Sequence, residues 1–421
     1  MQALVSRSKI DGSVAAPPSK SYTIRGLMCA ALARGKSRIV SPLGSDDTDA
    51  TMLVLRRVGT SIRQLKTGWS VTGNEFTAPS GELFCGDSAA TFRFMTALCS
   101  VIPGTCKLTA GMSLGKRPVG LLIDALQQLG VKCSANGNLP PVTVDGGKLF
   151  GGTTSMPGDV SSQYVSALLL VAPFAQNTLT IKLTTPLESR PYVMMTLDTM
   201  QWFGVSVSFD ETMDEFTVEP QHYDPMVYTV EGDWSSASYL LALGALAGKV
   251  EVTSLPVETM QGDRMMLQFL DEMGASITQN KSSVVVTQSK LKGIKADLTD
   301  CIDLLPTMAV LAAAAEGTSV FSGIARARIK ESDRIFAVRE GLARLGIRTT
   351  EEKDRLTVTG GRFAGALIDS KNDHRIAMAF SLLGVVHGGM TIAGAECVAK
   401  TYPEYWDVLK MLGGEVDLIG K

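Results

Sequence analysis

The stretch PPSKSYTIRGLMCAALARGKSRI, Pro17–Ile39, contains the unit from which the rest of the chain is built. Its two prolines hold the chain extended, because proline fixes φ and restricts the residue before it. Ser19 or Ser21 can cap a helix, and the apolar run from Ile24 to Ala31 predicts that helix. A turn that contains glycine and a short segment with a β-branched residue complete the stretch. It therefore predicts a helix followed by a strand.

Five further stretches repeat this order of polar opening, Ala/Leu-rich helix, short turn and strand, at a spacing of about 70 residues. They begin CGDSAATFRFMTAL at Cys85, PGDVSSQYVSALLL at Pro157, EGDWSSASYLLAL at Glu231, DCIDLLPTMAVL at Asp300 and SKNDHRIAMAFSLL at Ser370. A second series of helical patterns, in phase with the first, ends at Gly59, Gly130, Gly204, Gly274, Gly346 and Gly413. Glycine just past a helix is a common C-cap, and strand pairs follow five of these glycines. The sequence therefore predicts a β-α-β-α-β-β unit that occurs six times.

The composition is typical of a globular protein with a large core, since 45% of the 421 residues are hydrophobic and 19% are charged. A formal charge of −2 without runs of like charge argues against nucleic-acid binding. The chain shows neither the apolar core of a signal peptide nor an apolar run long enough for a membrane span. Seven scattered cysteines without a C-x-x-C pair, and only three histidines, indicate a reducing cytoplasm and no metal site. We therefore expect a cytoplasmic protein without a membrane segment.

Cations stand at five predicted helix starts, although a helix N-terminus favours acidic side chains. They are Lys20 and Arg25, Lys116 and Arg117, Lys330 and Arg334, Lys371, His374 and Arg375, and Lys400. Each cation could pair with a nearby carboxylate. Alternatively, the cations and the free N–H groups of the helix starts could bind phosphate or carboxylate ligands. Recurrence at five starts favours the second explanation and predicts a strongly positive cleft for small polyanionic substrates.

The usual nucleotide and hydrolase motifs are missing: the sequence has no G-x-x-x-x-G-K-[ST], no G-x-G-x-x-G after a strand and no G-x-S-x-G. Chemistry then falls to Lys, Arg, Asp and Glu side chains and to His374. Asp303, at the start of an apolar helix, could be an N-cap, and Glu331 could be a first-turn acid. In a cationic cleft both could serve as general acid or base. Ser161 and Ser162 could likewise be ligand donors or N-caps.

Six motifs together resemble those of the 5-enolpyruvylshikimate-3-phosphate synthase family. They are PPSKSYTIRGL, VSSQYVSALLLVAP, SRPYV, IKESDR, NDHRIAMAF and AKTYPEY, and they extend from residue 17 to residue 405. The resemblance implies an α/β fold, a two-lobed inside-out α/β barrel of six β-α-β-α-β-β repeats. Chain crossings are expected near Ala15–Pro18 and Glu231–Asp233. One lobe would comprise 1–16 and 232–421, with the N-terminal strand and the last three repeats, the other 17–231, and the active site would lie in the cleft.

The resemblance also implies the reaction, which is transfer of the enolpyruvyl group of phosphoenolpyruvate to the 5-hydroxyl of shikimate 3-phosphate, without a metal or other cofactor. The residues implied for shikimate 3-phosphate are Lys20, Ser21, Arg25, Ser161, Ser162, Gln163, Ser189, Tyr192, Asp303 and Lys330. Those implied for phosphoenolpyruvate are Lys20, Ala89, Arg117, Gln163, Arg334, Arg375 and Lys400. Asp303 would take the 5-hydroxyl proton and Glu331, with Lys20, would protonate C3, while His374 is a further catalytic candidate.

Two departures from the family pattern concern the site. The family usually reads N-A-G-T where this chain has Asp87-Ser88-Ala89-Ala90, and the added β-carbon of Ala89 predicts weak inhibition by glyphosate, the longer occupant of the phosphoenolpyruvate site. Arg326 stands where some members carry Asn near the shikimate phosphate.

Two alternatives remain. The sister UDP-N-acetylglucosamine enolpyruvyl transferase has Lys-Asn in its first motif, where this chain has Lys20-Ser21. The position of its reactive cysteine is occupied by Met112 in this chain. A catalytically inactive anion-binding repeat protein would be expected to have lost Asp303, Glu331 or Lys20. We expect a monomer that acts on small molecules.

Overall fold

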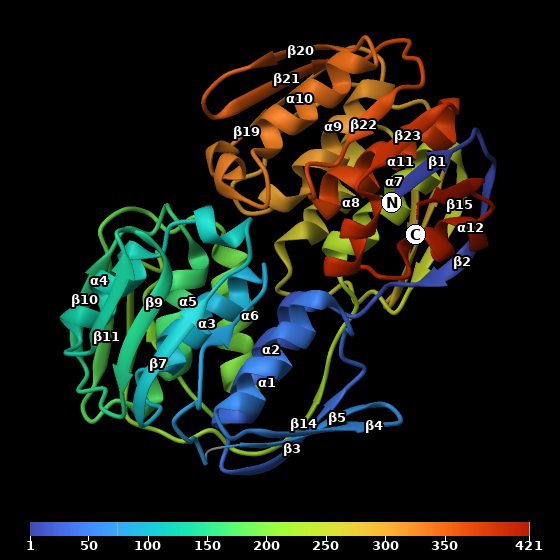
Figure 1. Cartoon of the computed structure of the whole chain (residues 1–421). Helices are drawn as coiled ribbons and strands as arrows, with labels where there is room; N and C mark the ends of the chain where they lie inside the picture. Colours follow the sequence, from blue (N-terminus) through green and yellow to red (C-terminus); the bar gives the residue numbers. More distant parts are fainter. Residues whose placement is uncertain (74, 421) are drawn as a thin grey trace. The chain divides into compact units, whose positions relative to one another are not determined.

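The computed structural model describes residues 1–73 and 75–420. The chain folds into two compact units, unit 1 with Met1–Pro17 and Glu231–Lys421, and unit 2 with Pro18–Val230. Figure 1 shows the elements of both units with their labels. Among the described residues, no helix has both the length and the apolar character that crossing a membrane requires.

Unit 2 contains six α-helices among its described residues: α1 (Lys20–Leu32), α2 (Asp46–Arg57), α3 (Ala89–Leu98), α4 (Gly120–Gln128), α5 (Ser162–Val171) and α6 (Arg190–Trp202). Two 3₁₀ turns accompany them, η1 (Leu114–Lys116) and η2 (Ala172–Phe174). Its strands are β3 (Gly35–Val40), β4 (Ser61–Leu65), β5 (Gly68–Gly73), β6 (Leu83–Phe84), β7 (Gly104–Thr109), β8 (Lys132–Asn136), β9 (Leu139–Gly146), β10 (Gly152–Met156), β11 (Leu179–Leu183), β12 (Ser208–Phe209), β13 (Glu215–Val218) and β14 (Val227–Thr229).

Unit 1 contains α7 (Trp234–Ala247), α8 (Met266–Glu272), α9 (Leu305–Ala314), α10 (Arg334–Arg344), α11 (His374–His387) and α12 (Tyr405–Met411). Its 3₁₀ turns are η3 (Gly262–Met265), η4 (Ile302–Leu304), η5 (Ala325–Ile329) and η6 (Ala395–Lys400). Its strands are β1 (Gln2–Val5), β2 (Ile10–Ala15), β15 (Gly248–Thr253), β16 (Ser276–Gln279), β17 (Ser283–Thr287), β18 (Lys295–Asp297), β19 (Thr318–Ser322), β20 (Arg348–Glu351), β21 (Arg355–Thr359), β22 (Leu367–Asp369), β23 (Met390–Ala393) and β24 (Val416–Ile419).

The strands of the described chain form six four-stranded sheets with one shared order. In the sheet β6-β7-β9-β8, for example, β6 and β7 are parallel, while β9 pairs antiparallel with both β7 and β8. A parallel pair needs a crossover, which α3 supplies here, whereas an antiparallel pair needs only a turn. The predicted β-α-β-α-β-β unit is therefore confirmed.

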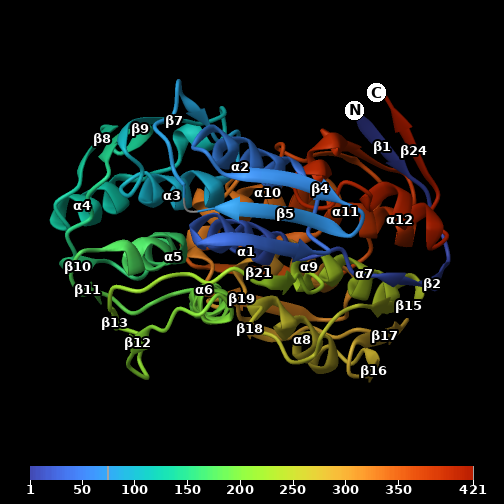
Figure 2. The ribbon, with the colours of Figure 1, turned by 90° about the horizontal axis from the view of Figure 1, so that it is seen from below.

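Three sheets take a strand from a distant part of the chain. In unit 2, β14 joins β3 in parallel, with Val227 opposite Arg38 and Thr229 opposite Val40. In unit 1, β2 pairs with β15, and β1 lies between β23 and β24. Figure 2 shows β1 beside β24, near the two ends of the chain. The expectation of one N-terminal strand was incomplete, because β1 and β2 enter two different sheets.

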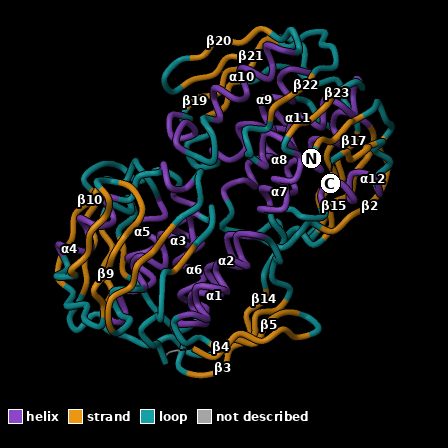
Figure 3. Tube along the Cα trace, in the orientation of Figure 1, coloured by secondary structure: helices purple, strands orange, loops and turns teal. Residues whose placement is uncertain are grey.

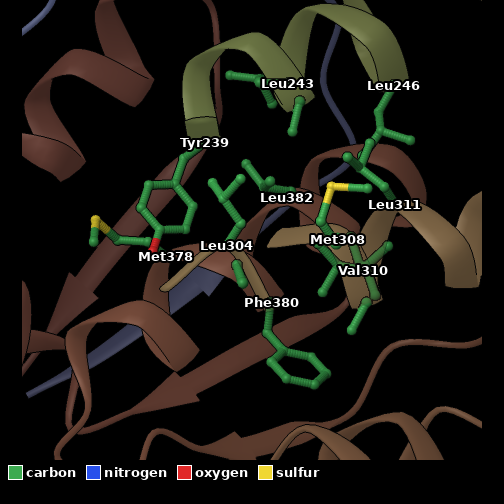
Figure 4. Packing of buried hydrophobic residues seen from close by; sticks show 14 of the residues in the cluster. Tyr239, Leu243, Leu246, Leu304, Met308, Val310, Leu311, Met378, Phe380 and Leu382 are labelled. Atoms are coloured by element: carbon green, nitrogen blue, oxygen red, sulfur yellow. The ribbon is translucent and has the colours of Figure 1, made fainter. Parts of the chain in front are cut away.

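Each unit has helices inside and sheets outside, as the orange strands around the purple helices show (Figure 3). In unit 1, α7, α9 and α11 are buried along nearly their whole length and pack against each other. Leu243 of α7, Met308 of α9 and Leu382 of α11 meet in this core (Figure 4). A helix that is apolar on all sides is stable only when it is surrounded by protein. Short β-sheets with one apolar face supply that cover.

The glycines at the predicted helix ends all have positive φ. The values are +102° for Gly59, +83° for Gly130, +84° for Gly204, +90° for Gly274, +81° for Gly346 and +101° for Gly413. Glycine adopts this left-handed conformation without the steric cost that a β-carbon brings. The glycine series therefore ends one helix in each repeat, as the sequence predicted.

Candidate active site

Asp303 is the centre of a charge cluster in unit 1. Its Oδ1 lies 2.7 Å from Arg334 Nη1 and 3.4 Å from Lys330 Nζ, and its Oδ2 lies 3.2 Å from Arg375 Nη2. Asp303 belongs to the turn η4, just before α9, so it does not cap that helix. Arg334 begins α10, and Arg375 follows the first residue of α11. The sequence therefore brings four of its candidate residues together from three repeated helix starts and one loop.

Arg334 binds two more carboxylates. Its Nε lies 2.8 Å from Asp373 Oδ2, and its Nη2 lies 2.6 Å from Glu331 Oε2. Glu331 also lies 3.6 Å from Lys400 Nζ, which adds Lys400 to the cluster. Arg334 is 1% exposed, so its charge is balanced inside the protein. Pairing with nearby carboxylates therefore accounts for the position of Arg334. Lys330 and Arg375 also pair with Asp303, and Lys400 also pairs with Glu331.

Burial and neighbouring charges together shift the pKa values of Asp303 and Lys330. Burial alone would raise the pKa of Asp303, but Arg375, Lys330 and Arg334 together hold it well below its usual range. Burial also lowers the pKa of Lys330 to about 8, against the opposing effect of the Asp303 carboxylate. Asp303 is therefore ionised near neutral pH, and Lys330 loses its proton at a pH of about 8.

His374 is placed differently from the other candidates of unit 1. It is the first residue of α11 and is 1% exposed. Its Nδ1 lies 3.8 Å from Asp373 Oδ1, and Asp373 is itself the N-cap of the helix. His374 is therefore buried beside the carboxylate that pairs with Arg334.

Lys20 begins α1 in unit 2 and is tied to the start of α2. Its Nζ lies 2.9 Å from Asp47 Oδ2. Ser19 is the N-cap of α1 and accepts the Tyr22 N–H at 3.4 Å, which decides between the two serines proposed as caps. Lys20 therefore starts the helix in a defined position, with a carboxylate partner from the next helix.

Arg25 lies one turn further along α1 and is 2% exposed. It donates to Thr196 Oγ1 at 2.8 Å, to the Ser21 carbonyl at 3.0 Å and to the Tyr192 carbonyl at 2.8 Å. Burial lowers the pKa of Arg25 to about 10, so the guanidinium stays charged at neutral pH. These contacts join three of the residues implied for shikimate 3-phosphate, namely Ser21, Arg25 and Tyr192.

Arg93 is a buried cation that the sequence analysis missed. Its Nη1 lies 2.5 Å from Gln163 Oε1 and 3.5 Å from Ser161 Oγ, and its guanidinium lies over the ring of Tyr164 at 5.1 Å. Ser161 occupies the N-cap position of α5, but its side chain makes no capping hydrogen bond there. The signal for Arg93 was present in TFRFMTAL, because a charge inside an apolar helix needs a buried partner.

The remaining candidates of unit 2 lie at helix starts and in one loop. Ala89 is the first residue of α3, and Ser162 is the first residue of α5. Ser189 is the N-cap of α6 and has a left-handed φ of 56°, which is uncommon for serine. Arg117 follows the turn η1 and is 8% exposed. Helix starts of this kind offer N–H groups to anions.

Three other residues bear on the expectations. Arg326 donates to the Thr299 carbonyl at 2.8 Å and contributes to the lowered pKa of Lys330, so it lies close to the cluster. Asp47 and Asp373, the partners of Lys20 and Arg334, were not predicted, because acids at helix starts are ordinary features. Within residues 1–73 and 75–420, no group of three or more His, Cys, Asp and Glu side chains is arranged to hold a metal ion.

A family model described as EPSP synthase (3-phosphoshikimate 1-carboxyvinyltransferase) matches residues 5–409 of the chain. A 3-phosphoshikimate 1-carboxyvinyltransferase of Dehalococcoides mccartyi is 49% identical over 418 residues, which cover 99% of each chain. The protein of the same name from Methanospirillum hungatei is 40% identical over 411 residues, or 95% of each chain. Among solved structures, an EPSP synthase from Acinetobacter baumannii has a TM-score of 0.84 at 27% identity and covers 99% of both chains. These likenesses extend over whole chains and agree with the α/β fold described above.

Proposed function

The chain belongs to the EPSP synthase (3-phosphoshikimate 1-carboxyvinyltransferase) family, and from this premise we propose how its side chains divide the reaction. The activity is that of a transferase of the shikimate pathway to chorismate and the aromatic amino acids. Enolpyruvyl passes from phosphoenolpyruvate to the 5-hydroxyl of shikimate 3-phosphate, and inorganic phosphate leaves. The comparisons favour neither the UDP-N-acetylglucosamine enzyme nor an inactive binding protein.

The substrates are both anionic, and cations from both units bind them. Shikimate 3-phosphate is bound by Lys20, Ser21, Arg25, Ser161, Ser162, Gln163, Ser189 and Tyr192 of unit 2 and by Asp303 and Lys330 of unit 1. Phosphoenolpyruvate is bound by Lys20, Ala89, Arg117 and Gln163 of unit 2 and by Arg334, Arg375 and Lys400 of unit 1. The arrangement that supports this division is the repeated placement of cations beside helix N-termini, where N–H groups add to the attraction for anions. Arg334 also orders the carboxylates of Asp303, Glu331 and Asp373.

Asp303 is the general base, and the cluster around it is the observation that carries the proposal. Its carboxylate is kept ionised by three cations, so it can accept a proton from the 5-hydroxyl as the oxygen attacks C2 of phosphoenolpyruvate. C3 gains a proton from Glu331 or Lys20, and the result is a tetrahedral intermediate. The same group then takes a proton back from C3 as phosphate leaves, which restores the double bond in the product.

Glyphosate inhibits this enzyme weakly. Ala89 stands where the family has glycine, and it is 6% exposed at the start of α3. A β-carbon in a tight pocket opposes the longer inhibitor more than the shorter substrate. We also expect a cytoplasmic protein, in keeping with cysteines that are all free thiols in the described chain, and we expect it to be a monomer.

Phosphate release tests the proposed activity. The protein is incubated with phosphoenolpyruvate and, in parallel, with shikimate 3-phosphate, with UDP-N-acetylglucosamine or with no acceptor. Of these acceptors, we expect only shikimate 3-phosphate to cause release of phosphate from phosphoenolpyruvate. Release with the nucleotide sugar instead, or equal release without an acceptor, would overturn the proposal.

The Asp303→Asn variant tests the role of the base. The change keeps the size of the side chain but removes the proton acceptor, so kcat should fall about a hundredfold or more. Binding of shikimate 3-phosphate, followed by calorimetry, should not weaken, because the change removes a negative charge beside the anion. A variant with unaltered kcat would show that another group takes the proton.

A further inference from the structure

Asp87 holds a loop that leads to Arg117. The Asp87 Oδ1 accepts hydrogen bonds from the Ser113 N–H at 3.0 Å and from the Leu114 N–H at 2.9 Å. The carbonyl of the neighbouring Gly86 accepts the Gly111 N–H at 2.7 Å. Two consecutive residues after β6 thus fasten the chain that follows β7. We call the segment 111–117 the Arg117 loop.

The hydrogen bonds continue from Asp87 to Arg117 through one residue. Leu114 donates its N–H to Asp87, and its carbonyl accepts the Arg117 N–H at 2.9 Å. A shift of the Leu114 peptide would therefore move the backbone of Arg117. Leu114 is 2% exposed, while Met112 at the tip of the loop is 89% exposed. The Asp87 carboxylate therefore fixes the part of the loop that lies between the exposed Met112 and the buried Arg117.

The contact between Asp87 and the loop is close enough to need glycine. A β-carbon at Gly111 would lie 2.6 Å from Asp87 Oδ1 and 2.7 Å from its Cγ. By contrast, a β-carbon at Gly115, in the same loop, would meet nothing within 4 Å. The loop therefore offers one position where a methyl group would displace the carboxylate and one where it would not.

We propose that Asp87 is a positioning residue, which sets the Arg117 loop so that the Arg117 guanidinium meets phosphoenolpyruvate. The inference rests on the proposed function and adds a residue that neither substrate was expected to touch. The property that the inference requires is an acceptor oxygen at the place of Oδ1, since the Ser113 and Leu114 donors are backbone N–H groups.

Steady-state kinetics of two Asp87 variants test this property. Asp87→Ala removes the acceptor, and KM for phosphoenolpyruvate should rise about tenfold, the scale expected when hydrogen bonds to a charged acceptor are lost. KM for shikimate 3-phosphate and kcat should change by less than about threefold, because the other cations stay in place. Asp87→Asn keeps an acceptor oxygen and should recover most of the lost affinity. If Asn behaved like Ala, charge rather than acceptor geometry would be responsible, and the inference would fall.

A double-mutant cycle tests whether Asp87 acts through Arg117. Arg117→Ala alone should raise KM for phosphoenolpyruvate, and adding Asp87→Ala should then change it little, since the arginine to be positioned is gone. Additive effects of the two changes would contradict the inference.

Two glycine variants give an independent test with a matched control. Gly111→Ala presses on the Asp87 carboxylate and should reproduce the rise in KM for phosphoenolpyruvate, whereas Gly115→Ala should not. Hydrogen exchange gives a readout without catalysis: the Ser113 and Leu114 amides should exchange faster in folded Asp87→Ala than in the wild type or Asp87→Asn. Unchanged exchange of these two amides would overturn the inference.

The outcomes separate the inference from the proposed function. A wild-type protein that releases no phosphate from the two substrates would refute the function. A wild type that is active, with a KM for phosphoenolpyruvate that Asp87→Ala leaves unchanged, would refute the positioning role alone.

Discussion

At the scale of single residues, Lys330 makes the charge of the Asp303 cluster depend on pH. Burial lowers its pKa to about 8, so the ammonium is charged below that pH and neutral above it. The charged form is the one that can bind an anion beside Asp303. We therefore predict that kcat/KM for shikimate 3-phosphate falls as the pH rises through about 8, because this ratio reports groups of the free enzyme.

Lys330→Arg is the control for this pH dependence. Arginine stays protonated throughout the range, so the fall in kcat/KM near pH 8 should disappear even if the absolute value is lower. A profile that is flat in the wild type, or that falls equally in the variant, would assign the titration to another group.

Ala89 makes a second prediction at this scale. Ala89→Gly should lower the inhibition constant of glyphosate about tenfold and change KM for phosphoenolpyruvate much less. Overpacking typically costs about 1–3 kcal/mol, and about 1.4 kcal/mol corresponds to tenfold in affinity. A wild-type inhibition constant well below KM for phosphoenolpyruvate would contradict tolerance. An unchanged inhibition constant in the variant would mean that Asp87 or Ala90, rather than Ala89, causes the tolerance.

The candidate residues were predictable where they stand inside a motif, and their partners were not. Lys20, Asp303 and Glu331 stand out because their charges occur at helix starts or beside other charges. The contacts of Asp47 and Arg93 join residues that are distant in the sequence. Asp47 lies 27 residues after Lys20, and Gln163 lies 70 residues after Arg93. No local pattern encodes such pairs, because the first depends on how two helices of one repeat pack and the second on how two repeats pack.

At the scale of elements, the packing of α10 on α11 depends on Gly341. A β-carbon there would lie 2.3 Å from the Cζ of Phe380, whose ring is fully buried. Gly341→Ala should therefore lower the thermal unfolding midpoint, since overpacking by about 1–3 kcal/mol exceeds the gain of about 1 kcal/mol in helix propensity.

The double variant Gly341→Ala/Phe380→Leu provides the check on this explanation. Leucine is smaller than phenylalanine and should make room for the methyl group, so adding Gly341→Ala to Phe380→Leu should cost less stability than adding it to the wild type. Equal costs in both backgrounds would place the strain elsewhere.

The repeated elements were predictable because their signals are local. Each glycine of the second series follows a helix within its own repeat and adopts the positive φ that the C-cap requires. The exchange of strands was less accessible to sequence reasoning. β14 has only three residues, Val227–Thr229, and its partner β3 lies almost 190 positions earlier, as the pair Val227–Arg38 shows. Pairing of this kind is decided by sheet assembly rather than by a local pattern.

At the scale of the whole molecule, each unit of the chain carries part of the proposed substrate set. Lys20, Arg25 and Arg117 belong to unit 2, and Asp303, Arg375 and Lys400 to unit 1. If both sets bind the same substrates, binding should draw the units together about the two chain crossings. Small-angle scattering should then show a smaller radius of gyration with shikimate 3-phosphate and phosphoenolpyruvate than without them. Glucose 6-phosphate serves as the anionic control, and an unchanged radius under saturating substrates would contradict closure.

The central claim is that this chain moves the enolpyruvyl group to shikimate 3-phosphate. Nuclear magnetic resonance with phosphoenolpyruvate labelled with ¹³C at C2 tests it most directly, because one spectrum follows the carbon that is transferred. We predict that the label moves into an enol ether of shikimate 3-phosphate while inorganic phosphate appears in equal amount, and that omission of the acceptor stops both changes. A label that stays in phosphoenolpyruvate, or that appears in pyruvate, with both substrates present would contradict the claim.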